Sequence, residues 1–225
     1  MHELVHNDRV IGGVNNASTQ KAIAFYNKFV KGELHATNAK TAEMCKLVEN
    51  SSRDSQIAFA NELSLICDKA DINVWELINL ANKHPRVNIL KPGCGVGGHC
   101  IPVDPYYMIQ RAADIGVPAG LITAARAVNR SMPNHVAQVL IDILWKAGLS
   151  AESTKVLLLG WSYKAEVGDP RETPAEPLAE ALQKRGIQVG VFDPHLSEES
   201  LPDSVEFIGD ISEAKGFNLA VLVTA

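Results

Sequence analysis

The chain has 225 residues, of which 46% are hydrophobic and 21% are charged, and its formal net charge is −5. This composition excludes a largely disordered chain and indicates one large or two modest folded domains. The mild negative charge and the lack of a Lys/Arg block argue against nucleic-acid partners and against an anionic membrane surface. No apolar run is long enough for a membrane span, and the first residues lack a secretory signal, so we expect a cytoplasmic protein.

The first forty residues are predicted to alternate short elements. Arg9–Gly13 has the pattern of a strand end, and Ser18 that of a helix N-cap. One face of the following helix is formed by Ala22, Phe25, Tyr26 and Phe29. This arrangement is typical of the tail of an α/β domain.

A long helix is predicted from Thr41 to about Asp71. Its apolar residues recur at helical spacing without an intervening proline or glycine: Phe59, Leu63, Ile66 and Ala70. A shorter helix is expected over 74–82. The next segment, 83–105, is broken by prolines and glycines and is predicted to be a functional loop. Helical spacing returns near Asp104, stops at 116–118 and resumes to about Gly148, with Ser131 and Pro133 marking a place where a helix can restart.

The composition changes after Gly148. Lys155–Leu159 is a continuous apolar run, as expected of a strand buried on both faces. A helix from about Thr173 to Lys184 and further strands near 189–193, 205–207 and 219–223 complete the pattern. This strand–helix–strand order predicts a right-handed parallel crossover and thus a small doubly wound, Rossmann-like α/β domain. Because a buried-type strand ends the chain, we expect a segment truncated at both ends.

The segment 91–105 is the most informative for chemistry. Its glycines at positions 93, 95, 97 and 98 let the backbone approach a ligand and direct N–H groups at an anion. Cys100 ends this cradle, and the helix that begins near Pro105 would favour a nucleophilic thiolate there. The alternative is a small buried cysteine in a glycine-rich turn.

Two other interpretations of this cysteine are weaker. A metal site at Cys94, His99 and Cys100 lacks a second ligand pair at zinc-like spacing, so no metal is predicted. A cysteine hydrolase would need His84 or His135, and nothing in the sequence singles out either residue. The four cysteines form no C-x-x-C pair, and we expect most of them to be reduced thiols.

Further candidate residues lie outside this loop. Lys46 and Asn50 share one face of the long helix, although Lys46 could equally be a solvated partner of a neighbouring glutamate. Lys164 and Arg171 follow the first strand of the C-terminal domain, where ligands bind in parallel sheets, and are candidates for phosphate contacts. Asp193 ends the next strand, and without a G-x-G-x-x-G turn we interpret it as a turn residue.

These motifs together resemble the UDP-glucose/GDP-mannose dehydrogenase family. Residues 84–93 and 97–105 resemble its catalytic-cysteine loop, 42–50 and 57–63 its central helix, and 169–175 the signature of its C-terminal domain. The branch that acts on UDP-N-acetylhexosamines is the most similar, with UDP-N-acetylmannosamine as the first expectation. The resemblance implies the tail of an NAD-binding domain over 1–38, an all-helical dimerisation domain over 39–149 and an incomplete UDP-sugar-binding domain over 150–225.

The resemblance also implies a mechanism. The C6 hydroxymethyl group of the UDP-sugar would be oxidised to a carboxylate in two hydride transfers to NAD. Cys100 would hold the intermediate first as a thiohemiacetal and then as a thioester. Lys46 and Asn50 would stabilise the developing oxyanion, and Asp104 would position the hydrolytic water together with Lys46.

The same resemblance implies the binding residues. For the UDP-sugar they are Arg86, reaching the neighbouring subunit's substrate, and Lys91, Pro92, Gly93, Gly95, Val96, Gly97, Tyr163 and Lys164; for NAD they are Cys100, Ile101, Pro102, Val103 and Arg171.

The long helix would pair with a second copy to form a homodimer. The family's glycine fingerprint and its main NAD-binding domain are absent from this sequence, so we expect a partial enzyme. The alternative is a non-catalytic, dimerising module that binds UDP-sugars.

Overall fold

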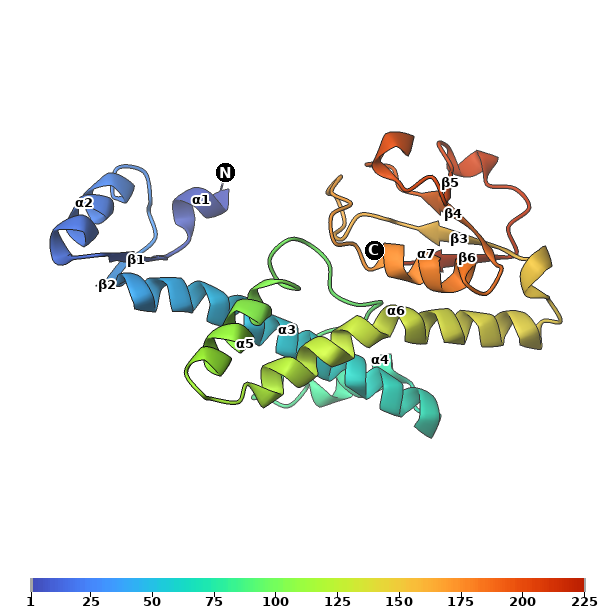
Figure 1. The fold of residues 1–225 in the computed structure, drawn as a ribbon, viewed down its shortest axis with the longest axis horizontal. Helices are drawn as coiled ribbons and strands as arrows, with labels where there is room; N and C mark the ends of the chain where they lie inside the picture. The colour runs from blue at the N-terminus through green and yellow to red at the C-terminus, as the bar shows by residue number, and fades with distance from the viewer. Residues whose placement is uncertain (1, 225) are drawn as a thin grey trace. The chain divides into compact units, whose positions relative to one another are not determined.

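The computed structural model describes residues 2–224. The chain divides into two compact units, with the boundary between Ser52 and Arg53. The helix α3 (Ala39–Ala70) contributes to both units (Figure 1). It confirms the predicted long helix, beginning two residues earlier than expected and ending one residue earlier. We describe each unit by itself.

The first unit is a small β-α-β arrangement. It contains α1 (His2–His6), β1 (Arg9–Gly13), α2 (Asn16–Tyr26) and β2 (Leu34–Asn38), and β1 and β2 pair in parallel. The expected strand and helix are confirmed, but the N-cap prediction was wrong. Asn15, not Ser18, caps α2: the Asn15 side chain accepts a hydrogen bond from the Ser18 backbone N–H at 2.9 Å. Asparagine and serine cap equally well, so sequence preference could not separate them.

The second unit begins with helices. After α3 come α4 (Val74–Ala81), α5 (Asp104–Asp114) and α6 (Gly120–Lys146). The predicted restart near Pro133 does not occur, because α6 continues through this proline. A proline in a helix loses one backbone hydrogen bond, but the buried neighbours Met132, Ala137 and Leu140 provide packing that offsets this loss.

The C-terminal sheet confirms the expected parallel crossover. Its elements are η1 (Ala151–Ser153), β3 (Lys155–Leu159), α7 (Ala175–Gln183), β4 (Gln188–Phe192), η2 (Glu198–Ser200), β5 (Glu206–Phe207), η3 (Ile211–Glu213) and β6 (Leu219–Leu222). The strand order is β5-β4-β3-β6, and all neighbouring strands are parallel. The central strand β3 covers the predicted apolar run.

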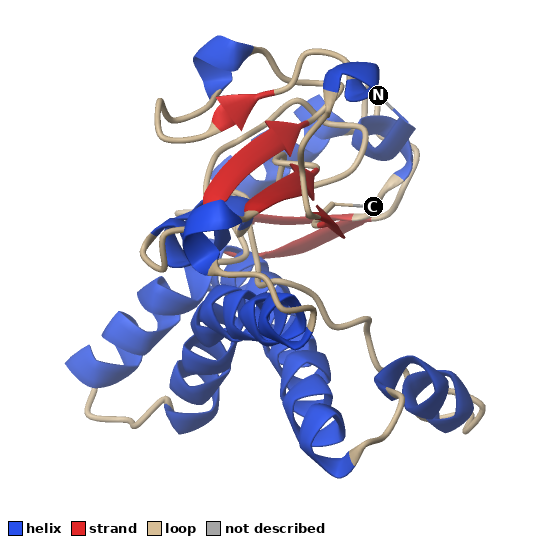
Figure 2. Cartoon of the chain, turned by 90° about the vertical axis from the view of Figure 1, so that its right-hand side faces the viewer, coloured by secondary structure: helices blue, strands red, loops and turns tan. Residues whose placement is uncertain are grey.

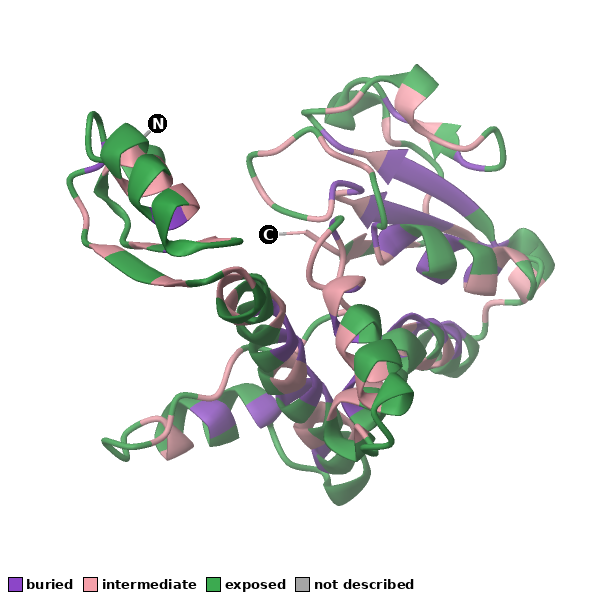
Figure 3. Cartoon of the chain, turned by 60° about the vertical axis from the view of Figure 1, so that its left-hand side comes forward, coloured by how far each residue is buried: buried purple, intermediate pink, exposed green. Residues whose placement is uncertain are grey.

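The main hydrophobic core lies between this sheet and the helices α6 and α7, which lie on the same side of it (Figures 1 and 2). The middle three residues of β3 and of β4 are buried, as the purple ribbon in Figure 3 shows. Leu158, Trp161, Leu178 and Leu182 are among the largest fully buried side chains. The carboxyl ends of β3 and β4 are thereby fixed at one edge of a rigid layer. Within residues 2–224, no helix is both long and apolar enough to cross a membrane.

Candidate functional site

The predicted Cys100 loop connects α4 to α5, and two asparagine side chains hold its first half. The Asn82 side chain accepts a hydrogen bond from the Ile89 N–H at 2.7 Å and donates one to the Ile89 carbonyl at 2.9 Å. Asn61, on α3, accepts from the Gly93 N–H at 2.9 Å. Side-chain hydrogen bonds thus replace the regular backbone pairing that this segment lacks.

Gly97 and Gly98 are required by close contacts with the C-terminal part of the chain. A Cβ atom on Gly97 would lie 2.6 Å from the Tyr163 Cβ and 2.8 Å from the Glu172 carbonyl oxygen. Gly98 has a φ of 89°, and a Cβ there would lie 2.9 Å from the Tyr163 ring. Gly97 and Tyr163, two of the predicted UDP-sugar residues, are therefore brought into contact. Lys164 follows directly and is exposed.

The two cysteines of the loop have different environments. The Cys94 thiol lies 3.8 Å from the Pro174 carbonyl oxygen, to which it donates, and burial raises the pKa of Cys94 to about 12. Cys94 is therefore a protonated structural thiol at neutral pH. Cys100 is half-buried, and its carbonyl accepts hydrogen bonds from the N–H groups of Val103 and Asp104 at 3.1 and 2.8 Å. Cys100 thus lies in the turn that leads into the first turn of α5.

Other predicted loop residues are more accessible. Arg86 and Lys91 are exposed, Pro92 and Val96 are half-buried, and Gly95 has a φ of 137°. A Cβ on Gly95 would lie 3.3 Å from the Asn129 carbonyl oxygen, whose usual helical donor is missing because residue 133 is proline. The loop therefore approaches α6 at the point where the proline interrupts the helical hydrogen bonds.

A cleft of about 630 Å³ opens beside the end of the loop. Its lining includes Pro102 and Val103, two of the predicted cofactor residues, and the side chains of Tyr106, Arg126, Arg130 and Glu172. The Arg130 guanidinium donates a hydrogen bond to the Tyr106 hydroxyl at 3.2 Å. Hydrogen bonds and attraction from Arg130 and Arg126 lower the pKa of Tyr106 despite the opposing effect of partial burial. The lining of the cleft thus contains two arginines, together with the carboxylates of Glu172 and Glu176.

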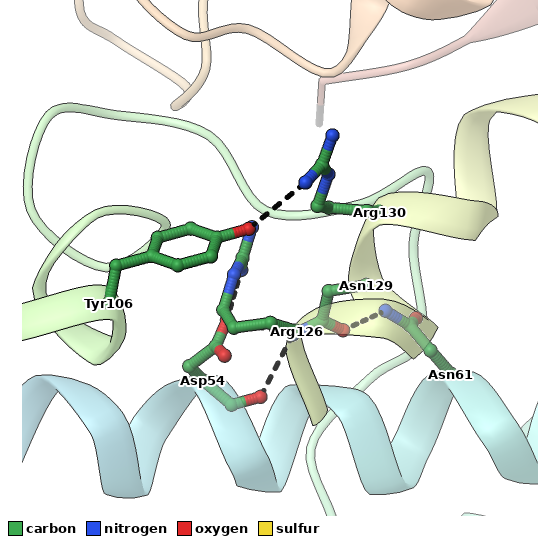
Figure 4. Close-up of polar contacts among 6 residues, drawn as sticks. All are labelled: Asp54, Asn61, Tyr106, Arg126, Asn129 and Arg130. Atoms are coloured by element: carbon green, nitrogen blue, oxygen red, sulfur yellow. Dashed lines mark hydrogen bonds and ion pairs between the residues drawn. The ribbon is translucent and has the colours of Figure 1, made fainter. Parts of the chain in front are cut away.

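A buried polar network lies between α3 and α6 beneath the loop (Figure 4). Asp54 pairs with Arg126 at 2.6 Å and accepts a hydrogen bond from Asn129 Nδ2 at 2.8 Å. Asn129 Oδ1 accepts from Asn61 at 2.9 Å, so the network continues to the Gly93 backbone. Sequence reasoning did not identify these residues. The signal available in the sequence was the spacing of these polar residues, which places each pair on one face of its helix. Asp54 and Asn61 are seven residues apart on α3, and Arg126 and Asn129 are three residues apart on α6.

The predicted pair on α3 is confirmed as a local contact. Lys46 Nζ donates a hydrogen bond to Asn50 Oδ1 at 3.3 Å, and Asn50 is buried. Lys46 also lies 3.7 Å from the Glu49 carboxylate on the exposed side of the helix. Both interpretations given by the sequence, a polar pair and a solvated ion pair, are thus present in the structure.

Arg171 forms a two-point ion pair with Asp169. Its Nε and Nη2 donate to the carboxylate at 2.8 and 2.6 Å. Hydrogen bonds from the Arg171 side chain and backbone, with a smaller attraction from His99, lower the pKa of Asp169 to about 2. The guanidinium remains largely exposed. This pair holds the turn between β3 and α7 beside the loop, because the Asp169 carbonyl accepts from the Tyr163 N–H at 3.2 Å.

Asp193 does more than terminate a turn. Its carboxylate accepts hydrogen bonds from the N–H groups of Trp161, Ser162 and His195 at 2.8–2.9 Å. Burial opposes ionisation, but these N–H donors outweigh it and lower the pKa of Asp193. Asp193 therefore fixes the ends of β3 and β4. A pocket of about 380 Å³ lies at this edge and includes Lys164 in its lining. No cluster of three or more potential metal ligands occurs within residues 2–224.

Known proteins share this combination of a central helical part and a C-terminal sheet. Residues 40–131 match the central domain of the UDP-glucose/GDP-mannose dehydrogenase family, and residues 157–225 match the UDP binding domain of the same family. The chain belongs to this family. The resemblance predicted from the Cys100 loop and the 169–175 signature is confirmed.

Within the UDP-glucose/GDP-mannose dehydrogenase family, the chain is 44% identical over 210 residues to UDP-N-acetyl-D-mannosamine dehydrogenase of Methanococcus vannielii, covering 91% of this chain and 48% of that protein. It is 46% identical over 207 residues to NDP-N-acetyl-D-galactosaminuronic acid dehydrogenase of Ralstonia solanacearum, covering 92% and 47%. The solved UDP-D-ManNAc dehydrogenase from Pyrococcus horikoshii has a TM-score of 0.88 at 39% identity, covering 99% of this chain and 51% of that one. The chain spans about half the length of the curated relatives it matches.

Proposed function

We propose that this chain provides the central and UDP-binding parts of an NAD-dependent UDP-N-acetylhexosamine 6-dehydrogenase, with UDP-N-acetylmannosamine as the preferred substrate. The observation that carries this proposal is the packing of Gly97 and Gly98 on Tyr163, because it joins the cysteine loop to the UDP binding domain. Relatives named for both N-acetylmannosamine and N-acetylgalactosaminuronic acid favour an N-acetylated sugar.

Substrate binding is proposed at the surface where these two segments meet. Residues 91–97 would surround the sugar and diphosphate, with donors from backbone N–H groups other than that of Gly93, which donates to Asn61. Tyr163 and Lys164 would contact the UDP-sugar from the carboxyl end of β3, a position where parallel sheets bind ligands. The pocket beside Lys164 supports this placement. Arg86, which is exposed, is proposed to reach the substrate of a second subunit.

Cys100 is the proposed nucleophile, and the burial of Cys94 supports this choice. After the first oxidation, the Cys100 sulfur would add to the C6 aldehyde carbon, and the carbonyl oxygen would take up a proton. Loss of a hydride and this proton would give a thioester. Water would then attack the carbonyl carbon, the C–S bond would break, and the thiolate would be regenerated.

The polar partners of Cys100 are proposed from the helices on which they lie. Lys46 and Asn50, already hydrogen-bonded to each other, would donate to the oxyanion that forms at C6. Asp104, the first residue of α5, follows Cys100 by four positions and would help position the hydrolytic water. Preorganised donors of this kind stabilise developing charge without having to reorient during the reaction.

A dinucleotide is proposed to approach Cys100 through the cleft beside Pro102 and Val103. Arg130 lines this cleft, and its exposed guanidinium would face an anionic group of the cofactor. When bound, NAD would accept the two hydrides. Ile101, Pro102 and Val103 would exclude water from one side, and Arg171 would offer its exposed guanidinium to the cofactor.

A homodimer is proposed through α3. The predicted apolar stripe contains Phe59 and Ile66, which are 53% and 57% exposed in the single chain. A second copy that packs along this stripe would remove the apolar surface from water.

The function is tested with the protein that carries this chain and a panel of UDP-sugars. We expect two NADH and one uronate per UDP-N-acetylmannosamine consumed, with slower turnover of the glucosamine and galactosamine epimers and none of UDP-glucose. UDP-sugar binding without any NADH would instead support a non-catalytic binding module.

A further inference from the structure

The buried network between α3 and α6 has a fixed direction. The Asp54 carboxylate can only accept hydrogen bonds, so the Asn129 amide must turn its NH₂ group toward Asp54. Asn129 Oδ1 then faces Asn61 and requires a donor, which the Asn61 NH₂ provides. The Asn61 Oδ1 is consequently left facing the loop, where it accepts from the Gly93 N–H. One buried charge thus sets the orientation of two amides in series.

The same network also reaches the other end of the loop. Arg126, the ionic partner of Asp54, lies over the Tyr106 ring at 5.7 Å. Tyr106 belongs to α5, six residues after Cys100, whereas Gly93 lies seven residues before it. Cys100 is therefore flanked on both sides by segments that connect to one buried carboxylate.

The burial of the network makes these orientations stable. Asp54 and Asn61 have no exposed surface, and Asn129 is 2% exposed. Polar groups at such depth keep their partners because water cannot replace a lost hydrogen bond. The Gly93 N–H is the point where this order is transmitted to an otherwise irregular loop.

We propose that Asn61 is a positioning residue: oriented by Asp54 through Asn129, it holds the Gly93 amide and thereby orders the loop that carries Cys100. The role in catalysis rests on the proposed function, whereas the ordering of the loop does not. Asn61 itself touches no reacting atom in this account.

Hydrogen exchange of the full chain tests the ordering without any ligand. In Asn61→Ala, the Gly93 N–H loses its acceptor, and we expect the peptide covering 90–97 to exchange about three- to tenfold faster. The matched control is Ser64→Ala, which removes a side-chain hydrogen bond at 2.6 Å from the same helix but none to the loop. The control should leave exchange of this peptide unchanged.

Asn61→Asp provides a second test that a purely structural role would not satisfy. The neutral acid keeps both hydrogen bonds, because its O–H donates to Asn129 Oδ1 while its carbonyl oxygen accepts from Gly93. The carboxylate still accepts from the Gly93 N–H, but it cannot donate to Asn129 Oδ1, so the two oxygens repel each other. Burial raises the pKa of this carboxyl, and the repulsion should displace the side chain and the loop as the pH rises. At pH about 5, the peptide covering 90–97 should exchange at the same rate in the variant and in the unaltered chain. At pH about 8, it should exchange faster in the variant.

The outcomes separate the inference from the proposed function. Unchanged exchange in Asn61→Ala, or a pH-independent Asn61→Asp, overturns the positioning role. If Asn61→Ala does not fold, the comparison of Asn61→Asp at the two pH values still decides. In the protein that carries this chain, kcat/KM of Asn61→Asp relative to the unaltered protein should fall with the same pH dependence. Loop exchange as expected, in a protein that oxidises no UDP-sugar, would contradict the proposed function alone.

Discussion

The sheet around β3 and the loop around Cys100 are held in place by different forces. In the sheet, apolar side chains such as Leu158 and Leu178 are fully buried between strands and helices. In the loop, Gly93 is held by a side-chain amide, and Gly97 packs against Tyr163 and the Glu172 backbone. The sheet is fixed by hydrophobic burial, whereas the loop is fixed by a few directional hydrogen bonds and by the absence of side chains.

This difference has a functional consequence. Burial tolerates changes of surface residues and keeps the UDP binding domain rigid. In the proposed function, the loop leaves its backbone accessible to a ligand and therefore cannot bury large side chains of its own. It depends on neighbours that are already rigid, namely α3, α6 and the end of β3. Substitutions in the two regions should therefore affect different properties.

The largest effect on stability is expected in the hydrophobic core that packs on the sheet. Leu178→Ala would remove a fully buried side chain from α7 and leave a cavity, at a cost of about 2–5 kcal/mol in the free energy of unfolding. Urea unfolding followed by circular dichroism measures this loss. A change below about 0.5 kcal/mol would contradict the assignment of α7 to the main core.

Gly97→Ala should affect the site more than the fold. The new methyl group would lie within 3 Å of the Tyr163 Cβ and the Glu172 carbonyl, so the loop must move, at a cost of about 1–3 kcal/mol. We expect kcat/KM to fall about 100-fold, because displacing the loop disturbs reacting groups.

The matched control is Gly120→Ala, outside the loop, where a Cβ meets no described atom within 4 Å. It should keep most of the activity. Equal losses in the two variants would contradict a specific role for the contact between the loop and Tyr163.

Ile66→Lys should weaken the proposed dimer without damaging the single chain, because this side chain is already 57% exposed. A lysine on the apolar stripe would be buried without a partner in the dimer, and we expect the dissociation constant to rise at least about tenfold. Sedimentation equilibrium measures this change, and Asp203→Lys, at an exposed loop position, is the charge control. An unchanged dimer would place the interface elsewhere.

The smallest effect concerns the pH dependence of the Asp169–Arg171 pair. The pKa of Asp169 is lowered from 3.8 to about 2, so the pair stabilises the fold above pH about 4, and this contribution is lost as the pH falls toward 2. In Arg171→Ala the pKa should return toward 3.8. Titration of the Asp169 carboxyl by NMR measures this pKa in the variant. A midpoint that stays near 2 would exclude Arg171 as the cause of the lowered pKa.

The sheet was largely predictable from the sequence because its signals are local. The apolar run of β3 and the helical spacing of α3 each follow from neighbouring residues. The errors at Ser18 and Pro133 also have local causes. Two equivalent capping residues lay within one turn, and a proline that usually interrupts a helix was retained by its buried neighbours.

The support of the site was not predictable in the same way. Asn61 bonds to Gly93 across 32 positions of sequence and to Asn129 across 68. No periodicity links such residues, and a single buried asparagine has no distinctive signal. The sequence indicated Cys100 and its glycines, but the burial of the Cys94 thiol, which favours Cys100 as the proposed nucleophile, became visible only in the structure.

The most direct test of the central claim compares Cys100→Ala with Cys94→Ala in the protein that carries this chain, counting NADH and uronate per UDP-N-acetylmannosamine. We predict that Cys94→Ala still forms two NADH per sugar, whereas Cys100→Ala forms no uronate. Two NADH and one uronate per sugar from Cys100→Ala, at the unaltered rate, would contradict the assignment of Cys100 as the nucleophile.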